Sequence, residues 1–114
     1  MLAEARSRIV RYLPEEAAAA EDVLLVDVRS VDERGRAGVI PHSVHVPRSV
    51  LEWRADQTSQ WRDGSIAGRR LVLVCAEGYS SSLAAASLVE LGVDAGDLIG
   101  GFEGWVAAGL PLVR

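Results

Sequence analysis

Apolar residues fall along the chain in short, continuous runs separated by polar segments. Residues 23–26 and 71–74 each form such a run, which is typical of strands that helices cover on both faces of a parallel sheet. Residues 44–46 predict a weaker third strand, and residues 98–99, followed by two glycines, predict a fourth. All four runs are far shorter than the roughly 18 apolar residues that a membrane-spanning helix needs.

The polar segments carry the signals of helix N-termini. Pro14 followed by two glutamates suits a first helical turn. Ser30 and Glu33 have the spacing of a capping box that opens a short helix, and residues 50–54 predict one or two further turns. Residues 9–12 are compatible with a short strand or with the end of an earlier helix, and the pattern does not decide between the two.

Residues 81–91 form the clearest helical pattern. The segment begins with serines, is rich in alanine, places leucines at helical spacing and is followed by Gly92, a common helix terminator. Residues 102–108 predict a last short helix, and residues 57–69, which have the weakest pattern, predict a surface loop. Strands that alternate with helices in this way predict an α/β domain with a small, mostly parallel β-sheet flanked by helices on both faces.

Composition and charge limit the classes of partner. The length of 114 residues suits one domain spanning residues 1–114, and 49% hydrophobic with 25% charged residues is typical of a soluble globular protein. A net charge of −4 argues against nucleic acid, which favours basic patches. Residues 1–6 lack the apolar run of a signal peptide. We therefore expect neither a nucleic-acid nor a membrane partner.

The chain has one cysteine, Cys75, and two histidines. A single cysteine excludes an internal disulfide, and so few cysteines and histidines argue against a zinc cluster. The expected environment is a reducing compartment, most simply the cytoplasm.

Cys75 ends the predicted strand 71–74 and opens the loop that leads to the helix 81–91. Ligands bind at the carboxyl ends of parallel strands, and a helix N-terminus favours a thiolate. Gly78 lets the loop curl, and the serines at 80–82 can donate hydrogen bonds or cap the helix. By residue type alone a single cysteine is more often a small buried hydrophobe. Its place in a strand–loop–helix unit favours a nucleophile.

The loop resembles the active loop of the rhodanese family, which has the pattern C-x-x-G-x-R/S-S. Here it reads Cys75-Ala76-Glu77-Gly78-Tyr79-Ser80-Ser81. Further segments resemble family motifs in the family's order. They are Leu25-Val26-Asp27-Val28-Arg29 for the strand ending in D-V-R, residues 33–47 for E-x-x-x-G-H-I-P-G-A-x-x-x-P, residues 98–105 for L-x-G-G-F-x-x-W, and Pro111 for the terminal G-x-P. The resemblance extends from about residue 9 to residue 111.

This resemblance implies a rhodanese-like fold and a sulfurtransferase activity. Cys75 would take a sulfane sulfur from thiosulfate or from a small or protein persulfide and become a persulfide itself. A thiophilic acceptor, cyanide in an assay or a thiol in the cell, would then remove the sulfur. No metal and no organic cofactor is needed. Besides Cys75, the implied substrate-binding residues are Ala76, Glu77, Gly78, Tyr79, Ser80 and Ser81.

Two loop positions bear on the choice of donor. Ser80 stands where the family frequently has arginine, although some members carry serine there. Without that arginine, an anionic donor is held less strongly. Glu77 adds a carboxylate that would raise the thiol pKa and repel thiosulfate, unless it points to solvent, which is the interpretation we favour. We expect thiosulfate to be a poorer donor than a persulfide.

Arginines and histidines outside the loop are weaker candidates. Arg48 and Arg54 could contact an anion near the cleft, against the simpler interpretation that they are solvated surface residues. The family's histidine is replaced by Val39, while His42 and His45 could act as general acids. We interpret His42 as a loop residue and His45 as a strand residue.

Other conspicuous side chains are interpreted as structural. Asp27, Arg29 and Glu33 belong to the motifs of the family, and the resemblance implies that Arg29 pairs with Glu33 and so ties strand to helix. Three tryptophans are expected to be packing residues, with the last the best candidate for the core: Trp53, Trp61 and Trp105.

Two other functions compete with sulfur transfer. Dual-specificity phosphatases share the rhodanese fold, but their longer loop ends in an arginine, and Ser80 and Ser81 cannot replace that cation. Arsenate reduction through an internal disulfide fails for want of a second cysteine. A non-enzymatic binding or sulfur-carrier module is the closer alternative, and the presence of Cys75 counts against it. The evidence for nucleotide binding through residues 100–104 is weak, because the spacing of the glycines is not G-x-G-x-x-G.

Overall fold

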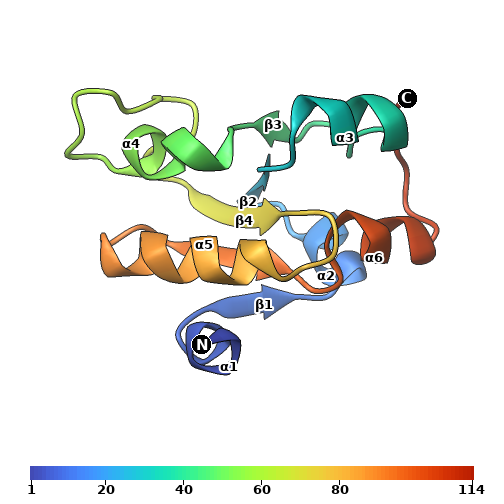
Figure 1. Cartoon of the computed structure of the whole chain (residues 1–114), viewed down its shortest axis with the longest axis horizontal. Helices are drawn as coiled ribbons and strands as arrows, with labels where there is room; N and C mark the ends of the chain where they lie inside the picture. Colours follow the sequence, from blue (N-terminus) through green and yellow to red (C-terminus); the bar gives the residue numbers. More distant parts are fainter.

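The computed structural model describes all of residues 1–114 and is built on a five-stranded sheet in which all neighbouring strands are parallel (Figure 1). The strands lie in the order β1-β5-β4-β2-β3. Their bounds are β1 Val10–Tyr12, β2 Val23–Asp27, β3 Val44–His45, β4 Arg70–Val74 and β5 Ala95–Leu98. The helices are α1 Leu2–Ser7, α2 Pro14–Ala19, α3 Val31–Ala37, α4 Leu51–Ala55 (preceded by the 3-10 turn η1, Arg48–Val50), α5 Ser80–Glu90 and α6 Gly101–Ala107. The predicted α/β class is confirmed.

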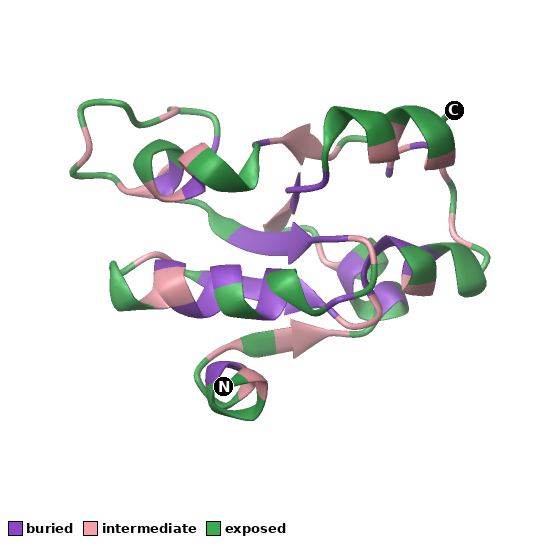
Figure 2. Ribbon diagram, in the orientation of Figure 1, coloured by how far each residue is buried: buried purple, intermediate pink, exposed green.

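Strand β4 is the centre of the sheet and supplies both cores. Leu71 and Leu73 belong to one hydrophobic cluster, whereas Val72 and Val74 belong to the other. Successive side chains of a strand point to opposite faces, so a strand with helices on both sides must be apolar at every position. This requirement explains the uninterrupted apolar run, and β4 is buried along almost its whole length in Figure 2.

Helices cover both faces of the sheet. Helices α4 and α5 contribute to the first cluster, and α1 packs against α5. Helices α2 and α6 contribute to the second cluster, through Ala17, Phe102 and Trp105. None of these helices is both long enough and apolar enough to span a bilayer.

The structure revises the bounds of one predicted strand and decides the element that the sequence left open. The fourth strand is Ala95–Leu98 and so begins before the predicted residues 98–99. Residues 10–12, left open between strand and helix, form β1 because they pair with β5, with Val10 opposite Gly96. The predicted surface loop 57–69 has no helix or strand, but its Ile66 is completely buried in the first cluster.

The tryptophans do not share one role. Trp105 lies in the second cluster and donates its indole N–H to the Pro111 carbonyl at 2.7 Å, so the prediction of a core residue is confirmed. Trp53 and Trp61 were expected to pack, but 60% and 57% of these residues is exposed. Trp53 lies on α4, and Trp61 lies in the loop after it.

The pairing of Arg29 with Glu33 is wrong. The Arg29 guanidinium turns back to Asp27, with Nη2 at 2.8 Å from Oδ2 and Nε at 3.0 Å from Oδ1. It also donates to the Gly38 carbonyl at 2.8 Å and lies over the Phe102 ring. Glu33 instead closes the capping box, accepting from the Ser30 amide. The buried Asp27 carboxylate needs a cation more than the partly exposed Glu33 does, because desolvation is the larger cost for Asp27.

The Asp27–Arg29 pair sits where β2 ends, and it makes the protein's stability depend on pH. Burial raises the pKa of Asp27, but hydrogen bonds from Arg29 and the charges of Arg29 and Arg34 outweigh burial and leave the pKa below 3.8. A lowered folded pKa contributes stability that is present above the ordinary carboxyl value and lost as pH falls through the folded value.

We expect Asp27→Asn to destabilise the fold at pH 7 by about 3–5 kcal/mol, because it leaves the buried Arg29 without its counter-charge. The difference in the free energy of unfolding between variant and wild type should narrow as pH falls below 3.8, because Asp27 of the wild type becomes protonated as pH falls through its lowered pKa. Urea unfolding at several pH values measures both effects. Arg70→Gln, which breaks an exposed pair with Asp22 and Asp94, serves as the control and should leave the midpoint nearly unchanged. A constant difference at all pH values would contradict the assignment.

Candidate active site

The loop after β4 rests on the first turn of α6. The Phe102 amide donates to the Cys75 carbonyl at 2.8 Å, and the Glu103 amide donates to the Ala76 carbonyl at 3.0 Å. Amides in the first turn of a helix have no partner within the helix, so they are free to hold the neighbouring loop. Two backbone hydrogen bonds therefore tie the loop at the carboxyl end of β4 to the start of α6, which lies beside it in Figure 1.

Two glycines make this contact possible. A Cβ on Gly101 would lie 2.4 Å from the Cys75 carbonyl oxygen, and a Cβ on Gly78 would lie 2.9 Å from the Gly100 nitrogen. Both residues also have positive φ angles, 60° and 92°. The G-G pair of the closing motif thus serves the cysteine loop, although the two segments lie far apart in the sequence.

Backbone amides converge on the sulfur of Cys75. The Gly78 amide donates to Sγ at 3.0 Å, and the Ser81 amide, in the first turn of α5, donates at 3.4 Å. The thiol lies 3.3 Å from the Ser81 hydroxyl oxygen. Ser81 and Ser82 do not cap the helix, because Tyr79 is the N-cap residue and makes no side-chain cap bond. Two groups of Ser81 thus contact the sulfur: its amide as a donor and its hydroxyl oxygen as an acceptor from the thiol.

These contacts favour the ionised form of Cys75. Burial raises the pKa of the thiol, but hydrogen bonds from the Ser81 and Ser80 side chains and from the Ser81 and Gly78 amides outweigh burial, so the pKa lies below its ordinary value. The thiolate is the nucleophilic form. Only 6% of the residue is exposed, which limits attack to small or extended partners that reach the sulfur.

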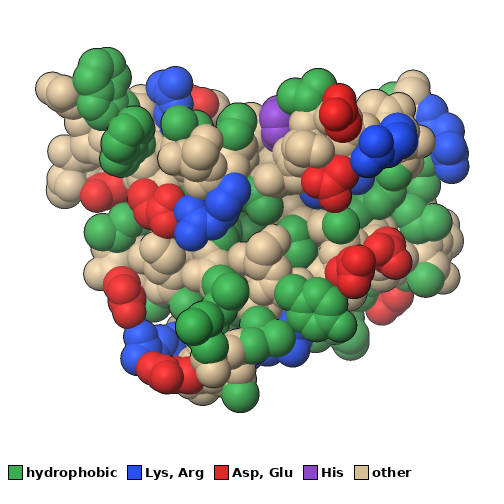
Figure 3. Space-filling model, in the orientation of Figure 1, with side chains coloured by type: hydrophobic (Ala, Val, Ile, Leu, Met, Phe, Trp, Pro, Cys, Tyr) green, Lys and Arg blue, Asp and Glu red, His purple; other side chains and the backbone are tan.

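A shallow pocket of about 280 Å³ opens over the sulfur. Its lining is Val28, Arg29, Glu33, Cys75, Ala76, Glu77, Tyr79 and Ser80. The only cation among these residues is Arg29, which Asp27 already engages. Glu33 and Glu77 add carboxylates, and Glu77 is exposed, as we expected. The space-filling view shows acidic and basic side chains interspersed, without a large field of one sign (Figure 3).

Residues predicted outside the loop do not reach this pocket. Arg48, a predicted anion contact, pairs with Glu52 at 2.8 Å one helical turn along, so its charge is satisfied away from the pocket. Arg54 donates to the Trp61 carbonyl. His42 lies exposed in a turn, with a φ of 67°. His45 lies on β3, and one of its ring nitrogens is 2.9 Å from the Arg29 carbonyl. No group of three or more His, Cys, Asp or Glu side chains is placed to hold a metal ion.

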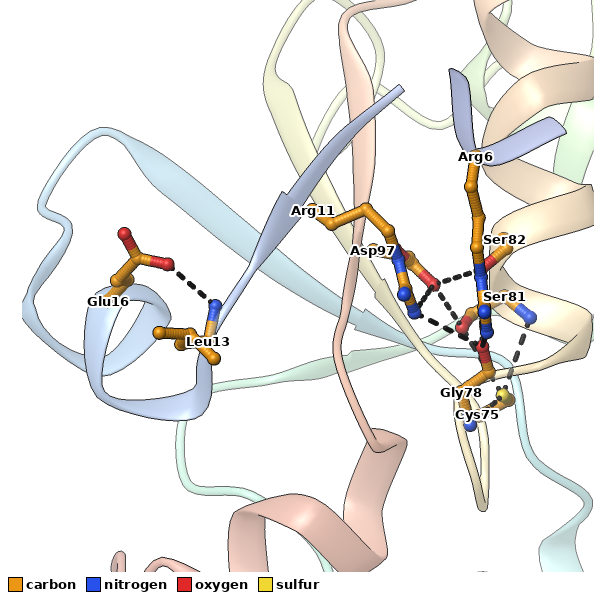
Figure 4. Close-up of polar contacts among 9 residues, drawn as sticks. All are labelled: Arg6, Arg11, Leu13, Glu16, Cys75, Gly78, Ser81, Ser82 and Asp97. Carbon is orange, nitrogen blue, oxygen red and sulfur yellow. Dashed lines mark hydrogen bonds and ion pairs between the residues drawn. The ribbon is translucent and has the colours of Figure 1, made fainter. Parts of the chain in front are cut away.

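Sequence reasoning missed the groups behind the loop. Asp97 of β5 is completely buried and accepts hydrogen bonds from the hydroxyls of Ser81 at 2.9 Å and Ser82 at 2.7 Å (Figure 4). Arg11 of β1 pairs with it at 2.8 Å, and Arg6 of α1 bonds both Ser82 and the Gly78 carbonyl. The sequence offers one signal for this network: Asp97 directly precedes the predicted strand 98–99, and the strand in fact begins at Ala95 and so includes Asp97.

A sequence model of the rhodanese-like domain family matches residues 13–108, which include the whole cysteine loop and its seat on α6. The chain belongs to the rhodanese-like domain family. The predicted family and fold are therefore confirmed. Arg6 and Arg11 lie before the matched segment of this rhodanese-like domain. No curated protein matches the chain.

Solved structures agree with this assignment. A protein of unknown function from Rhodopseudomonas palustris, a possible tyrosine phosphatase, is 33% identical, with a TM-score of 0.89 over 97% of this chain and 89% of its own. A rhodanese-related protein from Thermoplasma volcanium is 24% identical, with a TM-score of 0.72 over 90% of this chain and 96% of its own. A rhodanese-like domain protein from Staphylococcus aureus is 23% identical, with a TM-score of 0.70 over 93% of this chain and 100% of its own. The last two show likeness of fold.

The hydrogen bonds to Cys75 should be visible in its reactivity. We expect the rate of alkylation by iodoacetamide to rise with pH with a midpoint below about 8.5, the value of a free thiol, because the folded loop stabilises the thiolate. The same protein unfolded in urea, which retains the sequence but not the loop, is the control. A folded midpoint at or above the unfolded one would contradict the geometry described for the sulfur.

Proposed function

We propose that this rhodanese-like domain carries a sulfane sulfur as a persulfide on Cys75 and passes it to a thiol. The observation that supports this most directly is the convergence of the Gly78 and Ser81 amides on Sγ. These donors stabilise negative charge on sulfur both before attack and when the cysteine leaves again. They act without any side-chain cation, so they suit a monoanionic thiolate or persulfide.

The transfer takes two balanced displacements. The Cys75 thiolate attacks the outer sulfur of a donor R–S–SH, the donor's S–S bond breaks, and its electron pair leaves on R–S⁻. Cys75 then carries an S–SH group, and the same amides that bind the thiolate can bind its anion. An acceptor thiolate attacks the outer sulfur, a new S–S bond forms, and Cys75 departs as a thiolate.

The charges around the pocket support a persulfide rather than thiosulfate as the donor. Thiosulfate is a dianion, and the carboxylates of Glu33 and Glu77 line the pocket. Arg29 is the one cation in the lining, and two hydrogen bonds to Asp27 neutralise it. A persulfide carries only one negative charge on its sulfur, so it meets less repulsion than thiosulfate does.

Hydrolysis of phosphate esters has less support, although one similar structure is a possible tyrosine phosphatase. Phosphoryl transfer needs a bidentate cation on the equatorial oxygens. The loop has Ser80 and Ser81 in that region, while Arg6 and Arg11 point their hydrogen bonds at Gly78, Ser82 and Asp97 behind the loop. The fold is also compatible with a binding module that performs no chemistry. The loading experiment below distinguishes such a module from a sulfur carrier.

We expect wild-type protein incubated with cysteine persulfide to gain the mass of one sulfur atom, and cyanide to remove it. Intact-protein mass spectrometry measures both steps. Cys75→Ser, which keeps the size of the side chain and removes its nucleophile, should gain nothing. If Cys75 alkylates readily but neither cysteine persulfide nor thiosulfate loads it, the binding-module alternative takes the place of the sulfur carrier.

We expect Glu77→Gln to increase the rate of loading from thiosulfate by roughly threefold at low salt, because it removes one like charge from the rim. Loading from cysteine persulfide should change less, and the gain with thiosulfate should shrink as salt is added. Glu90→Gln makes the same change of net charge on an exposed residue at the far end of α5 and should alter neither rate. Equal gains in both variants would show that only net charge matters.

A further inference from the structure

A buried polar network lies directly behind the cysteine loop and contains a carboxylate that the proposed chemistry does not use. Asp97 has no exposed surface, yet it accepts four hydrogen bonds (Figure 4). The donors are Arg11 Nε at 2.8 Å and Nη2 at 3.3 Å, Ser81 Oγ at 2.9 Å and Ser82 Oγ at 2.7 Å. Burying this charge is costly, and these hydrogen bonds and the charge of Arg11 offset that cost.

The Ser81 hydroxyl stands between Asp97 and the sulfur of Cys75. Its oxygen lies 3.3 Å from Sγ and 2.9 Å from the Asp97 carboxylate. A hydroxyl has one proton to donate. While Cys75 is a thiol, its S–H donates to Ser81 and Ser81 donates to Asp97. Once Cys75 is a thiolate or a persulfide anion, two anions compete for the same hydroxyl proton.

Arg11 decides that competition. Its guanidinium forms two bonds to the Asp97 carboxylate and neutralises it, so Asp97 holds the Ser81 proton less strongly. Ser82 supplies a further donor to the same Oδ2, which keeps Asp97 satisfied when Ser81 turns away. Arg11 also approaches the Gly78 carbonyl at 3.4 Å, and Arg6 donates to it at 3.0 Å. Gly78 is the residue whose amide binds sulfur.

We infer that Ser81 is a hydrogen-bond switch between Asp97 and the Cys75 sulfur, and that Arg11 is a positioning residue that biases it toward sulfur. Arg11 comes from β1 and acts from behind the loop, where the loop itself carries serine in place of arginine. The inference rests on the proposed role of Cys75 as the sulfur-carrying nucleophile, but it concerns the thiol itself and is tested without any sulfur donor.

Charged groups on the elements around the loop enter the balance at the sulfur. Asp97 of β5 and Arg11 of β1 lie behind the loop, and Arg6 of α1 binds the Gly78 carbonyl. The exposed Glu103 belongs to the first turn of α6, against which the loop packs. Glu77 belongs to the loop itself and Glu33 to α3, and both line the pocket on the outer side with Arg29, which Asp27 neutralises. The inner pair therefore offers substitutions that leave the outer charges untouched.

The test measures the pH dependence of Cys75 alkylation by iodoacetamide in two variants with opposite expected signs. Arg11→Gln removes the cation paired with Asp97, so Asp97 should hold the Ser81 proton more strongly; the thiol pKa should rise and the rate below that pKa should fall roughly threefold or more. Asp97→Asn removes the competing charge and frees the Ser81 proton, so the thiol pKa should fall. A general loosening of the loop would move both variants in the same direction, and that result overturns the proposal.

Matched variants complete the experiment. Arg8→Gln removes a positive charge between Arg6 and Arg11 in sequence, but its partners are the exposed Glu4 and Glu90, and it should not alter the profile. Arg11→Lys restores the charge without the bidentate hydrogen bonding and should recover part of the alkylation rate that Arg11→Gln loses. The thiol pKa of the double variant Arg11→Gln/Asp97→Asn should lie close to that of wild type, because the two shifts oppose each other. If both single variants shift the pKa in the same direction and the double variant shows their sum, the switch is contradicted.

Circular dichroism and thermal unfolding establish that each variant is folded. If Asp97→Asn does not fold, Ser81→Ala provides the measurement, because it removes one hydroxyl and keeps the amide that binds sulfur. Ser81→Ala should raise the thiol pKa, and an unchanged pKa there would overturn the proposal. Failure of sulfur loading with these alkylation shifts intact would instead count against the proposed function alone.

Discussion

The close packing of the cysteine loop on the start of α6 is the constraint on which the rest of the site depends. Two backbone hydrogen bonds, from Phe102 to Cys75 and from Glu103 to Ala76, hold the loop at a distance that admits no side chain on Gly101. With the start of the loop held in this way, the Gly78 and Ser81 amides lie within hydrogen-bond distance of the sulfur. A site made from backbone in this manner needs little of its side chains beyond the nucleophile.

Hydrogen bonds from backbone amides take the place of the loop arginine that the family frequently carries. Stabilisation of the sulfur anion comes from amides and from the Ser81 hydroxyl, while positive charge is placed behind the loop on Arg6 and Arg11. The open side of the pocket is left with two carboxylates and one arginine already paired. Under the proposed function, this distribution of charge favours sulfur donors that carry less negative charge than thiosulfate.

The second ion pair at a strand end, Asp27 with Arg29, has a different character. It has no contact with the sulfur, and its guanidinium covers the Phe102 ring and binds the Gly38 carbonyl. It joins the end of β2 to the turn after α3 and to α6, and so keeps the wall of the pocket in place. The resemblance placed Arg29 correctly as a structural residue but paired it with Glu33, which caps its own helix instead.

Local sequence determined the elements that short-range physics controls. The apolar runs at β2 and β4 predicted a covered parallel sheet because every position of such a strand is buried, and Ser30 and Glu33 predicted a helix start because both partners of a capping box lie within one turn. The strand–loop–helix context of Cys75 pointed to its chemistry for the same reason. Tertiary structure alone decided the rest: whether Arg48 reached the pocket, which tryptophans were buried, and which acid would partner Arg29. It alone brought Arg6, Arg11 and Asp97 behind Cys75, because residues up to 86 positions apart in sequence become neighbours only when β1 adds to the edge of β5.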